Sequence, residues 1–151
     1  LEKKSAGLVW EDDAVVETFD GKFYWAKDVE RKLADENEVD EDGKAVNDPR
    51  TGKRMVQLGL KSLWVTRTKE TANSLLSTSD WYVTRKAEAD VAMPSDISKY
   101  RTGVRTASKT IEDKINGCAD LDAFKALFVV PVDSDKKPTG NSPITDFPDE
   151  V

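Results

Sequence analysis

Histidine is absent from this chain, and cysteine occurs once, as Cys118. Without histidine, the chain lacks the usual base at neutral pH and the commonest metal ligand, so Ser-His-Asp triads, Cys-His pairs and zinc sites with histidine ligands are excluded. A single cysteine excludes an intrachain disulfide and a cysteine-cluster metal site. We therefore expect no metal and no other cofactor, and we expect Cys118 to be a small buried or half-buried residue.

Long apolar runs are also missing. No stretch approaches the roughly 20 apolar residues that span a bilayer, and no signal-peptide core follows the first residues, so we expect a soluble chain that makes no membrane contact. The 151 residues suit one ordinary domain, with 38% apolar against 34% charged residues. The core should be small, or completed by a partner.

Charge is unevenly distributed along the chain. Residues 35–42 hold six carboxylates and no base, which equals the formal net charge of −6. Residues 61–109 instead hold nine Lys or Arg against five acids. This surplus of basic residues is modest, and the negative net charge of the whole chain repels polyanions, so a nucleic acid is a disfavoured partner. We expect these basic residues to form a solvated helix face.

The N-terminal segment, residues 1–27, has the pattern of a small β-hairpin. Two β-prone runs, Ala14–Phe19 and Lys22–Trp25, meet at Asp20-Gly21. Asp-Gly is typical of a two-residue hairpin turn, because both central positions need positive φ. A sheet this small is barely stable alone, so it should pack on a helix or extend a neighbour's sheet.

The next segment, residues 28–58, loses apolar periodicity and collects turn signals. This pattern predicts an acidic, irregular loop or linker with one helical turn at Val29–Ala34. An Asp-x-Asp-Gly pattern at residues 40–43 is not a calcium loop, because Pro49 stands where the bidentate Glu belongs. A flexible charged loop is the better interpretation.

Beyond residue 58 the apolar period becomes that of a helix. Apolar residues spaced by three and four predict helices at about 60–77 and 96–116. Ser95 and Gly117 are the expected caps of the second helix, and Asp120 is the expected cap of a short third helix. The second helix carries the clearest apolar stripe: Ile97, Tyr100, Val104, Ala107, Ile111 and Ile115.

A short motif joins the two long helices. It contains Leu75-Leu76 and Asp80-Trp81-Tyr82, with Arg67 upstream and Pro94, Tyr100-Arg101 and Val104-Arg105 downstream. These residues resemble the bacteriophage tail assembly chaperone family, whose pattern has an Arg-rich helix ending in Leu-Leu, then Ser/Thr-Asp-Trp, a Pro-containing connector and a Tyr-Arg-x-x-x-Arg helix. The module is also similar to parts of tail-fibre and other virion proteins of tailed phages. The resemblance covers roughly residues 60–116 and implies a role in phage tail assembly or architecture.

Trp81 and Tyr82 lie between the helices, and two roles compete for them. We expect Trp81 to close the open end of the helix pair as a lid over Leu75, Leu76 and Tyr100, since a lone Trp between amphipathic helices is usually core. The alternative is that Trp81 and Tyr82 bind a partner.

A basic stripe, formed by Arg101, Arg105 and Lys109, runs beside the apolar stripe of the second helix. One interpretation is solvation with pairing to acids such as Glu70 and Asp113. The other is a docking face for an acidic partner surface, whose binding should weaken with salt.

The C-terminal segment, residues 129–151, holds four of the six prolines and cannot form its own core. We expect an extended arm that contacts another chain or another copy of this chain, with Phe147 in an apolar pocket. Folding back over the protein's own helices is the alternative.

Acid pairs such as Glu11 with Asp12, or Asp90 with Asp96, are formal candidates for catalysis. So small a core makes a deep cleft improbable, so we predict neither an enzyme nor a small-molecule substrate.

The sequence therefore predicts an α+β protein in which residues 59–128 form a helical hairpin with a short third helix, flanked by the N-terminal hairpin, the acidic loop and the extended arm. The predicted function is binding: tail or tail-fibre assembly or architecture through contacts with other tail or virion proteins, or with further copies in a homo-oligomer. We expect a virion component of the tail region, assembled in the host cytoplasm. The alternative is a carbohydrate-binding host-recognition module of a tail fibre.

Overall fold

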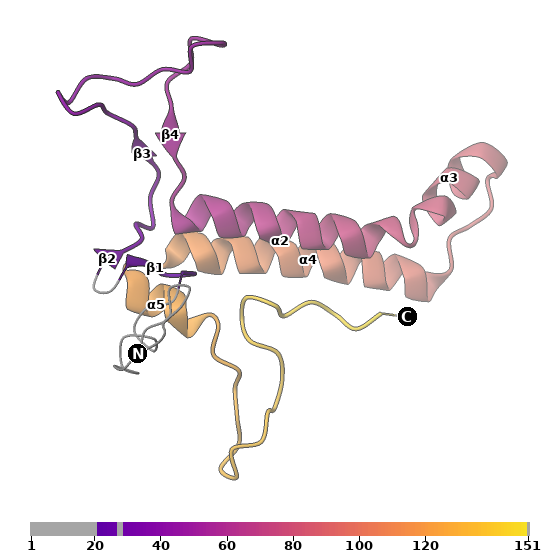
Figure 1. Ribbon diagram of the computed structural model, residues 1–151. Coiled ribbons are helices and arrows are strands. Elements are labelled where there is room, and N and C mark those ends of the chain that lie inside the picture. Colours follow the sequence, from indigo (N-terminus) through magenta and orange to yellow (C-terminus); the bar gives the residue numbers. More distant parts are fainter. Residues whose placement is uncertain (1–20, 27–28, 151) are drawn as a thin grey trace, which may run out of the picture. The chain divides into compact units, whose positions relative to one another are not determined.

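The structure is a computed structural model that describes residues 21–26 and 29–150 (Figure 1). These residues contain four helices and two antiparallel pairs of short strands, so the fold is mixed α+β, as the sequence predicts. The chain divides into two compact units, residues 1–60 and 61–151. The strands belong to the first unit, and the helical hairpin lies in the second.

The first strand pair consists of β1 (Tyr24–Ala26) and β2 (Val29–Glu30), which run antiparallel. The pairing continues past β2, because the backbone N–H of Arg31 donates to the carbonyl of Phe23 at 2.8 Å. The helical turn predicted at residues 29–34 is therefore wrong. The first strand of the hairpin predicted across residues 20–21 lies outside the described residues.

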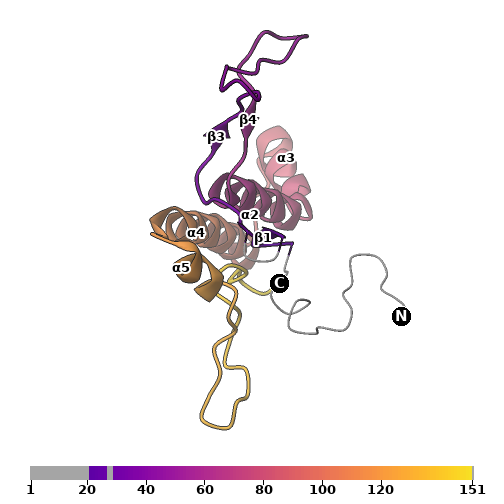
Figure 2. The same cartoon turned by 60° about the vertical axis from the view of Figure 1, so that its left-hand side comes forward.

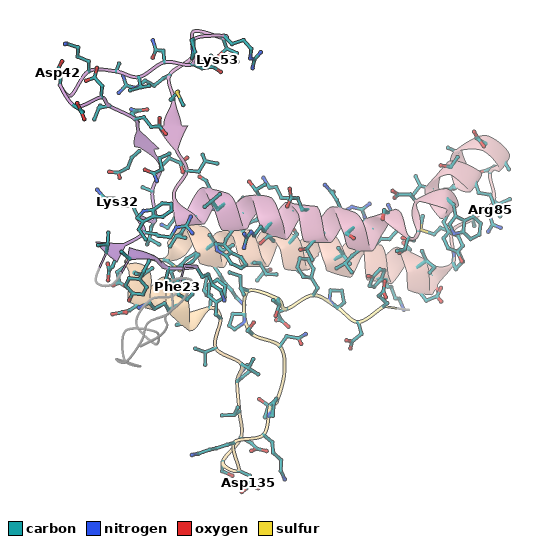
Figure 3. The ribbon with its side chains drawn as sticks, in the orientation of Figure 1. Phe23, Lys32, Asp42, Lys53, Arg85 and Asp135 are labelled. Atoms are coloured by element: carbon teal, nitrogen blue, oxygen red, sulfur yellow. The ribbon has the colours of Figure 1, made fainter. Side chains whose placement is uncertain are left out.

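The second strand pair is the stem of a forked arm, residues 36–57. In the stem, β3 (Glu36–Asn37) pairs antiparallel with β4 (Val56–Gln57). Beyond the stem the arm divides into two fingers, closed by bridges between Val39 and Ala45 and between Asn47 and Arg54. Figure 3 marks Asp42 and Lys53 on the two fingers. The predicted irregular loop is thus built on strand pairing.

A ring of three backbone hydrogen bonds joins the stem to both fingers. The N–H of Glu38 donates to the carbonyl of Met55 (2.9 Å), that of Met55 donates to Val46 (2.9 Å), and that of Val46 donates to Glu38 (3.2 Å). Each of the three segments is thereby held by the other two, so the fork does not depend on a hydrophobic core.

An aspartate carboxylate organises the tip of each finger. Oδ1 of Asp40 accepts from the backbone N–H groups of Asp42 and Lys44, and the positive φ that the turn needs falls on Gly43. Oδ1 of Asp48 accepts in the same way from the backbone N–H groups of Arg50 and Thr51. Both tips lie within residues 28–58, the segment in which the sequence collects turn signals.

The base of the forked arm is fixed by Gly59. Its N–H donates to Oδ1 of Asp35 at 2.7 Å. A Cβ at this position would lie 2.4 Å from the carbonyl of Ala34, so only glycine fits. The following N–H, of Leu60, donates to the carbonyl of Lys32 at 2.9 Å, and the first long helix begins there.

Helices α2 (Leu60–Ser77) and α4 (Ser95–Gly117) lie side by side and antiparallel in both views (Figures 1 and 2). Both were predicted from apolar spacing, which places the buried residues on one face of each helix. None of the helices in the described part of the chain is long and apolar enough to cross a membrane. The buried stripe of α4 contains Tyr100, Val104, Ile111 and Ile115.

The ends of α4 differ from the prediction. Ser95 is the first helical residue and Pro94 takes the N-cap position, while Gly117 is the last helical residue. The chain leaves the helix through Cys118, which is extended and buried, so the predicted left-handed glycine cap is wrong. Burial raises the pKa of the Cys118 thiol, consistent with a small core residue.

The short third helix, α5 (Leu121–Ala126), is confirmed together with its cap. Oδ1 of Asp120 accepts from the backbone N–H of Ala123 at 2.8 Å. The helix buries Phe124 completely. The rings of Phe128 and Trp64 meet edge to face at 4.7 Å, which joins this part of the chain to α2.

The C-terminal segment folds back over the chain's own helices. It first forms a narrow hairpin, in which Val132 pairs with Pro138, and then returns along the helical pair (Figure 1). Ile144 is buried, and Phe147 packs against the cluster of buried residues between α2 and α4. The predicted contact of Phe147 with another chain is therefore replaced by the self-packing alternative.

Candidate docking site at helix α3

The sequence missed α3 (Asp80–Ala89), which lies where a connector was expected. None of its residues is buried, so it has no core-facing stripe that periodicity would reveal. It ends at Asp90, whose φ of 49° is left-handed. The site described below is built on this helix and on the start of α4.

Arg101 of α4 holds the corner between α2 and α3. Its Nη1 donates to the carbonyl of Leu76 and to Oγ of Ser79, both at 2.7 Å, and its Nη2 donates to Oδ1 of Asp80 at 2.8 Å. The Leu76 carbonyl belongs to the last turn of α2, where carbonyls lack helical partners, so the guanidinium caps that helix. Arg101 is 6% exposed, which removes it from the predicted exposed stripe.

Three side chains of α3 form an aromatic–arginine stack: Trp81, Tyr82 and Arg85. The two rings stack with centroids 3.9 Å apart. The Cζ atom of Arg85 lies 4.8 Å from the Trp81 centroid and 5.6 Å from the Tyr82 centroid. Residues three and four apart share a helix face, which brings Arg85 onto both rings. Figure 3 marks Arg85 on this helix.

Trp81 is not the predicted lid over the helix pair, because it is 51% exposed. Phe147 of the C-terminal segment packs instead against the cluster that contains Tyr100, together with Leu75 and Leu76. The local sequence around Trp81 gave no sign that a residue so far along the chain would take this place. Trp81 is thus left at the surface.

A pocket of about 300 Å³ opens beside the aromatic–arginine stack. Its walls come from the end of α2, from α3, from the start of α4 and from the C-terminal segment. The aromatic rings of the lining residues give the pocket apolar walls. The hydroxyl groups and one carboxylate make the rest of the lining polar. The lining residues are Thr78, Ser79, Trp81, Tyr82, Ile97, Tyr100 and Glu150.

Two buried side-chain polar atoms have no hydrogen-bond partner: Oη of Tyr100, which lines the pocket, and Nε of Arg85, which belongs to the aromatic–arginine stack. Tyr100 is 7% exposed. Burial, with the nearby charge of Glu150, raises the pKa of the Tyr100 hydroxyl, so it keeps its proton at neutral pH. Both atoms are therefore hydrogen-bond donors without an acceptor.

The other predicted site residues do not join this pocket. Arg105 is exposed on α4, with Nη1 3.4 Å from the carbonyl of Arg101. Lys109 pairs with Asp113, and this hydrogen bond raises the pKa of the lysine. The arrangement of Lys109 matches the solvation and pairing interpretation of the basic stripe.

Sequence reasoning missed Arg85, Tyr100 and Glu150 as site residues. Tyr100 was assigned to the core, which is correct for its ring but says nothing of its hydroxyl. Arg85 would have been found as the residue four after Trp81 had α3 been predicted. Glu150 is brought to the pocket only by the folded-back segment.

The described residues contain no cluster of three His, Cys, Asp or Glu side chains that could hold a metal ion. The chemistry that the site offers is recognition: the pocket has stacking surfaces, a buried hydroxyl and a carboxylate, and the adjoining stack carries the Arg85 cation. Comparisons with protein-family models, with curated proteins and with solved structures found no match.

Proposed function

We propose that this chain is a non-enzymatic binding protein of a tailed bacteriophage, which acts in tail or tail-fibre assembly or architecture and stays in the virion. Its partners are other tail or virion proteins, and α3 is the surface that binds them. The motif resemblance over residues 60–116 supports the phage setting. The aromatic–arginine stack supports the mode of action.

The observation that carries the proposal is the exposure of Trp81 in an ordered stack. Trp, Tyr and Arg are the residues most enriched where protein interfaces concentrate their binding energy. The stack is preorganised, since Arg85 already lies over both rings and Arg101 anchors the start of the helix. Ordering these side chains before binding reduces the entropy that binding costs.

The forked arm supports the same mode of action from the other unit. The arm and the residue that follows it expose large apolar side chains, although no residue of the arm is buried. Strand edges and apolar side chains of this kind are suited to burial in a larger assembly. The exposed residues are Val39, Met55, Val56 and Leu58.

Mass spectrometry of purified particles of the phage that encodes the chain tests the virion assignment. We expect to find the chain in intact particles, and we expect its amount per particle to stay constant through repeated density-gradient purification. Absence from the particles would contradict the assignment as a structural component.

The Trp81→Ala variant tests the docking surface. We expect its incorporation into particles to fall by about tenfold or more, the usual effect of truncating an interface hot spot. Val83→Ala is the matched control, because Val83 is exposed on the same helix two residues, or roughly 200°, from Trp81. Equal incorporation of the two variants would remove α3 from the mechanism.

A second candidate function, carbohydrate binding by a host-recognition module, is favoured by one observation. An exposed Trp ring stands beside a pocket that contains hydroxyl groups and the Glu150 carboxylate. Sugar sites combine stacking rings with such polar groups. A glycan array separates the two functions, since saturable binding to one sugar class favours the second.

A further inference from the structure

The hydroxyl of Tyr100 lines the pocket beside α3 and is buried without a hydrogen-bond partner. Tyr100 is 7% exposed, and its Oη meets neither a donor nor an acceptor. Native proteins pair almost all such groups, because an unpaired buried polar atom lowers stability. A phenylalanine would fill the same space without this cost, so the hydroxyl points to a ligand.

The other two hydroxyls that line the pocket have already used their hydrogens. Thr78 and Ser79 donate them to the carbonyls of Leu75 and Leu76. The Ser79 oxygen also accepts from the guanidinium of Arg101 at 2.7 Å. A hydroxyl whose hydrogen is engaged can offer a ligand only its oxygen, as an acceptor. This wall of the pocket therefore favours a ligand that donates hydrogen bonds.

The charge at the pocket is negative. Among the described residues that line it, only Glu150 is charged, and this side chain is exposed. Burial and the charge of Glu150 raise the pKa of the Tyr100 hydroxyl, whereas a neighbouring cation would lower it. Arg101 is paired with Asp80, and Arg85 lies on the aromatic–arginine stack without lining the pocket. The pocket therefore favours a cation.

The apolar walls and the spread of the acceptors select a lysine side chain among cations. Trp81, Tyr82 and Ile97 offer apolar surface to the hydrocarbon stem of a lysine, and aromatic rings also attract its ammonium. An ammonium has three rotatable donors, which suit acceptors on separate residues such as Glu150 and Tyr100. A planar guanidinium suits the two oxygens of a single carboxylate better.

We propose that the pocket beside α3 receives a lysine side chain of a partner protein, whose stem packs on Trp81 and whose ammonium donates to the Glu150 carboxylate and to Oη of Tyr100. The inference rests on the proposed docking function and names the partner's chemistry. The C-terminal segment is thereby part of the docking surface: Phe147 packs it against the helices, and Glu150 supplies the charge.

Proton–nitrogen correlation NMR of the full chain tests the proposal. The probe is Nα-acetyl-lysine methylamide, and the control is the same compound with its ammonium acetylated, which keeps the stem and loses the charge. The readout is the indole N–H signal of Trp81, assigned by its absence from the Trp81→Phe variant. We expect a saturable shift with the probe and at least about tenfold weaker binding of the control, as suits charge-assisted hydrogen bonds. Added salt should weaken binding of the probe.

Variants assign the binding to the named atoms. Glu150→Gln should weaken binding of the probe by about fivefold, the upper range for an exposed ion pair. Asp149→Asn is the matched control and should weaken it by less than about twofold, because Asp149 is exposed and does not line the pocket. Tyr100→Phe should weaken binding by about tenfold while its melting temperature stays equal or rises, because the hydroxyl has no partner in the free protein.

Equal binding of the probe and its acetylated control would overturn the proposal, and so would undiminished binding by Glu150→Gln or by Tyr100→Phe with its fold intact. A shift of the Trp81 signal by a methyl glycoside, but not by the lysine probe, would replace the proposal with the carbohydrate function.

The proposed function fails separately. If Trp81→Ala loses particle incorporation but the two lysine compounds are not distinguished, docking through α3 stands and the lysine pocket falls. If the compounds are distinguished but the chain is absent from particles, the pocket stands and the virion assignment falls.

Discussion

Arg101 and Asp80 form an ion pair with 2.8 Å between Nη2 and Oδ1, in which the arginine side chain is 7% exposed and the aspartate side chain 61%. The two partners therefore differ in what they lose if the pair is broken. Asp80 is open to water, whereas the guanidinium also satisfies the Leu76 carbonyl and the Ser79 hydroxyl. The stability of this corner depends on the arginine.

Replacing Arg101 by Met should lower the free energy of unfolding by about 2–3 kcal/mol, because it removes charge-assisted hydrogen bonds from the part-buried Leu76 carbonyl and the buried Ser79 hydroxyl. Asp80→Asn should cost less than about 1 kcal/mol, as for other exposed ion-pair partners. Urea unfolding followed by circular dichroism measures both. Equal losses would show that the ion pair itself, not the capping, carries the energy.

Replacing Trp81 by Ala should change the free energy of unfolding by less than about 1 kcal/mol, because half of the side chain is already in water. The matched core variant is Phe124→Ala, which should cost about 3–5 kcal/mol since Phe124 is fully buried. Thermal and urea unfolding compare the two. A loss above about 3 kcal/mol for Trp81→Ala would instead support the prediction from the sequence that Trp81 is a buried lid over the helix pair.

The C-terminal segment should contribute to the stability of the isolated chain. Ile144→Ala removes a side chain that is 5% exposed and should cost about 2–4 kcal/mol. Val130→Ala, on the exposed part of the same segment, should cost less than about 0.5 kcal/mol. If both variants melt like the wild type, the segment is not part of this fold, and its docking on another chain becomes the better interpretation.

Acid should open the finger of residues 47–54. The backbone hydrogen bond from Arg50, assisted by Thr51, lowers the pKa of Asp48 below the ordinary value of 3.8. A lowered folded-state pKa means that the carboxylate stabilises the finger above about pH 3.8, and that this contribution is lost as the pH falls through the folded-state pKa. Amide hydrogen exchange at Arg50 and Thr51 should accelerate over that range. Asp48→Asn should exchange faster at neutral pH and show no acid step.

The sequence was sufficient to predict the helices that have a buried face. Helices α2 and α4 follow from apolar spacing, and α5 follows from the Asp120 cap with buried residues behind it. Helix α3 has no buried face, so its pattern carries no signal. The forked arm was missed for a different reason: its turns are local and visible, but the pairing of Glu38 with Met55 spans a long loop.

The candidate site was only partly predictable. Trp81 and Tyr82 stand out by residue type, and the structure places them in one stack. Arg101 and Arg105 look alike in sequence, yet one is buried and the other exposed, because only Arg101 meets the end of α2. That Tyr100 lacks an acceptor depends on every neighbour at once, so no local pattern could reveal it.

The ring of hydrogen bonds among Glu38, Val46 and Met55 also makes the two fingers independent modules. Each finger is a closed loop that leaves the ring and returns to it, so a residue inserted at one tip shifts no register in the stem or in the other finger. Loop tips of this kind tolerate insertion. The forked arm is consequently a natural graft point, where two foreign sequences of different length can be displayed side by side without altering the helical unit.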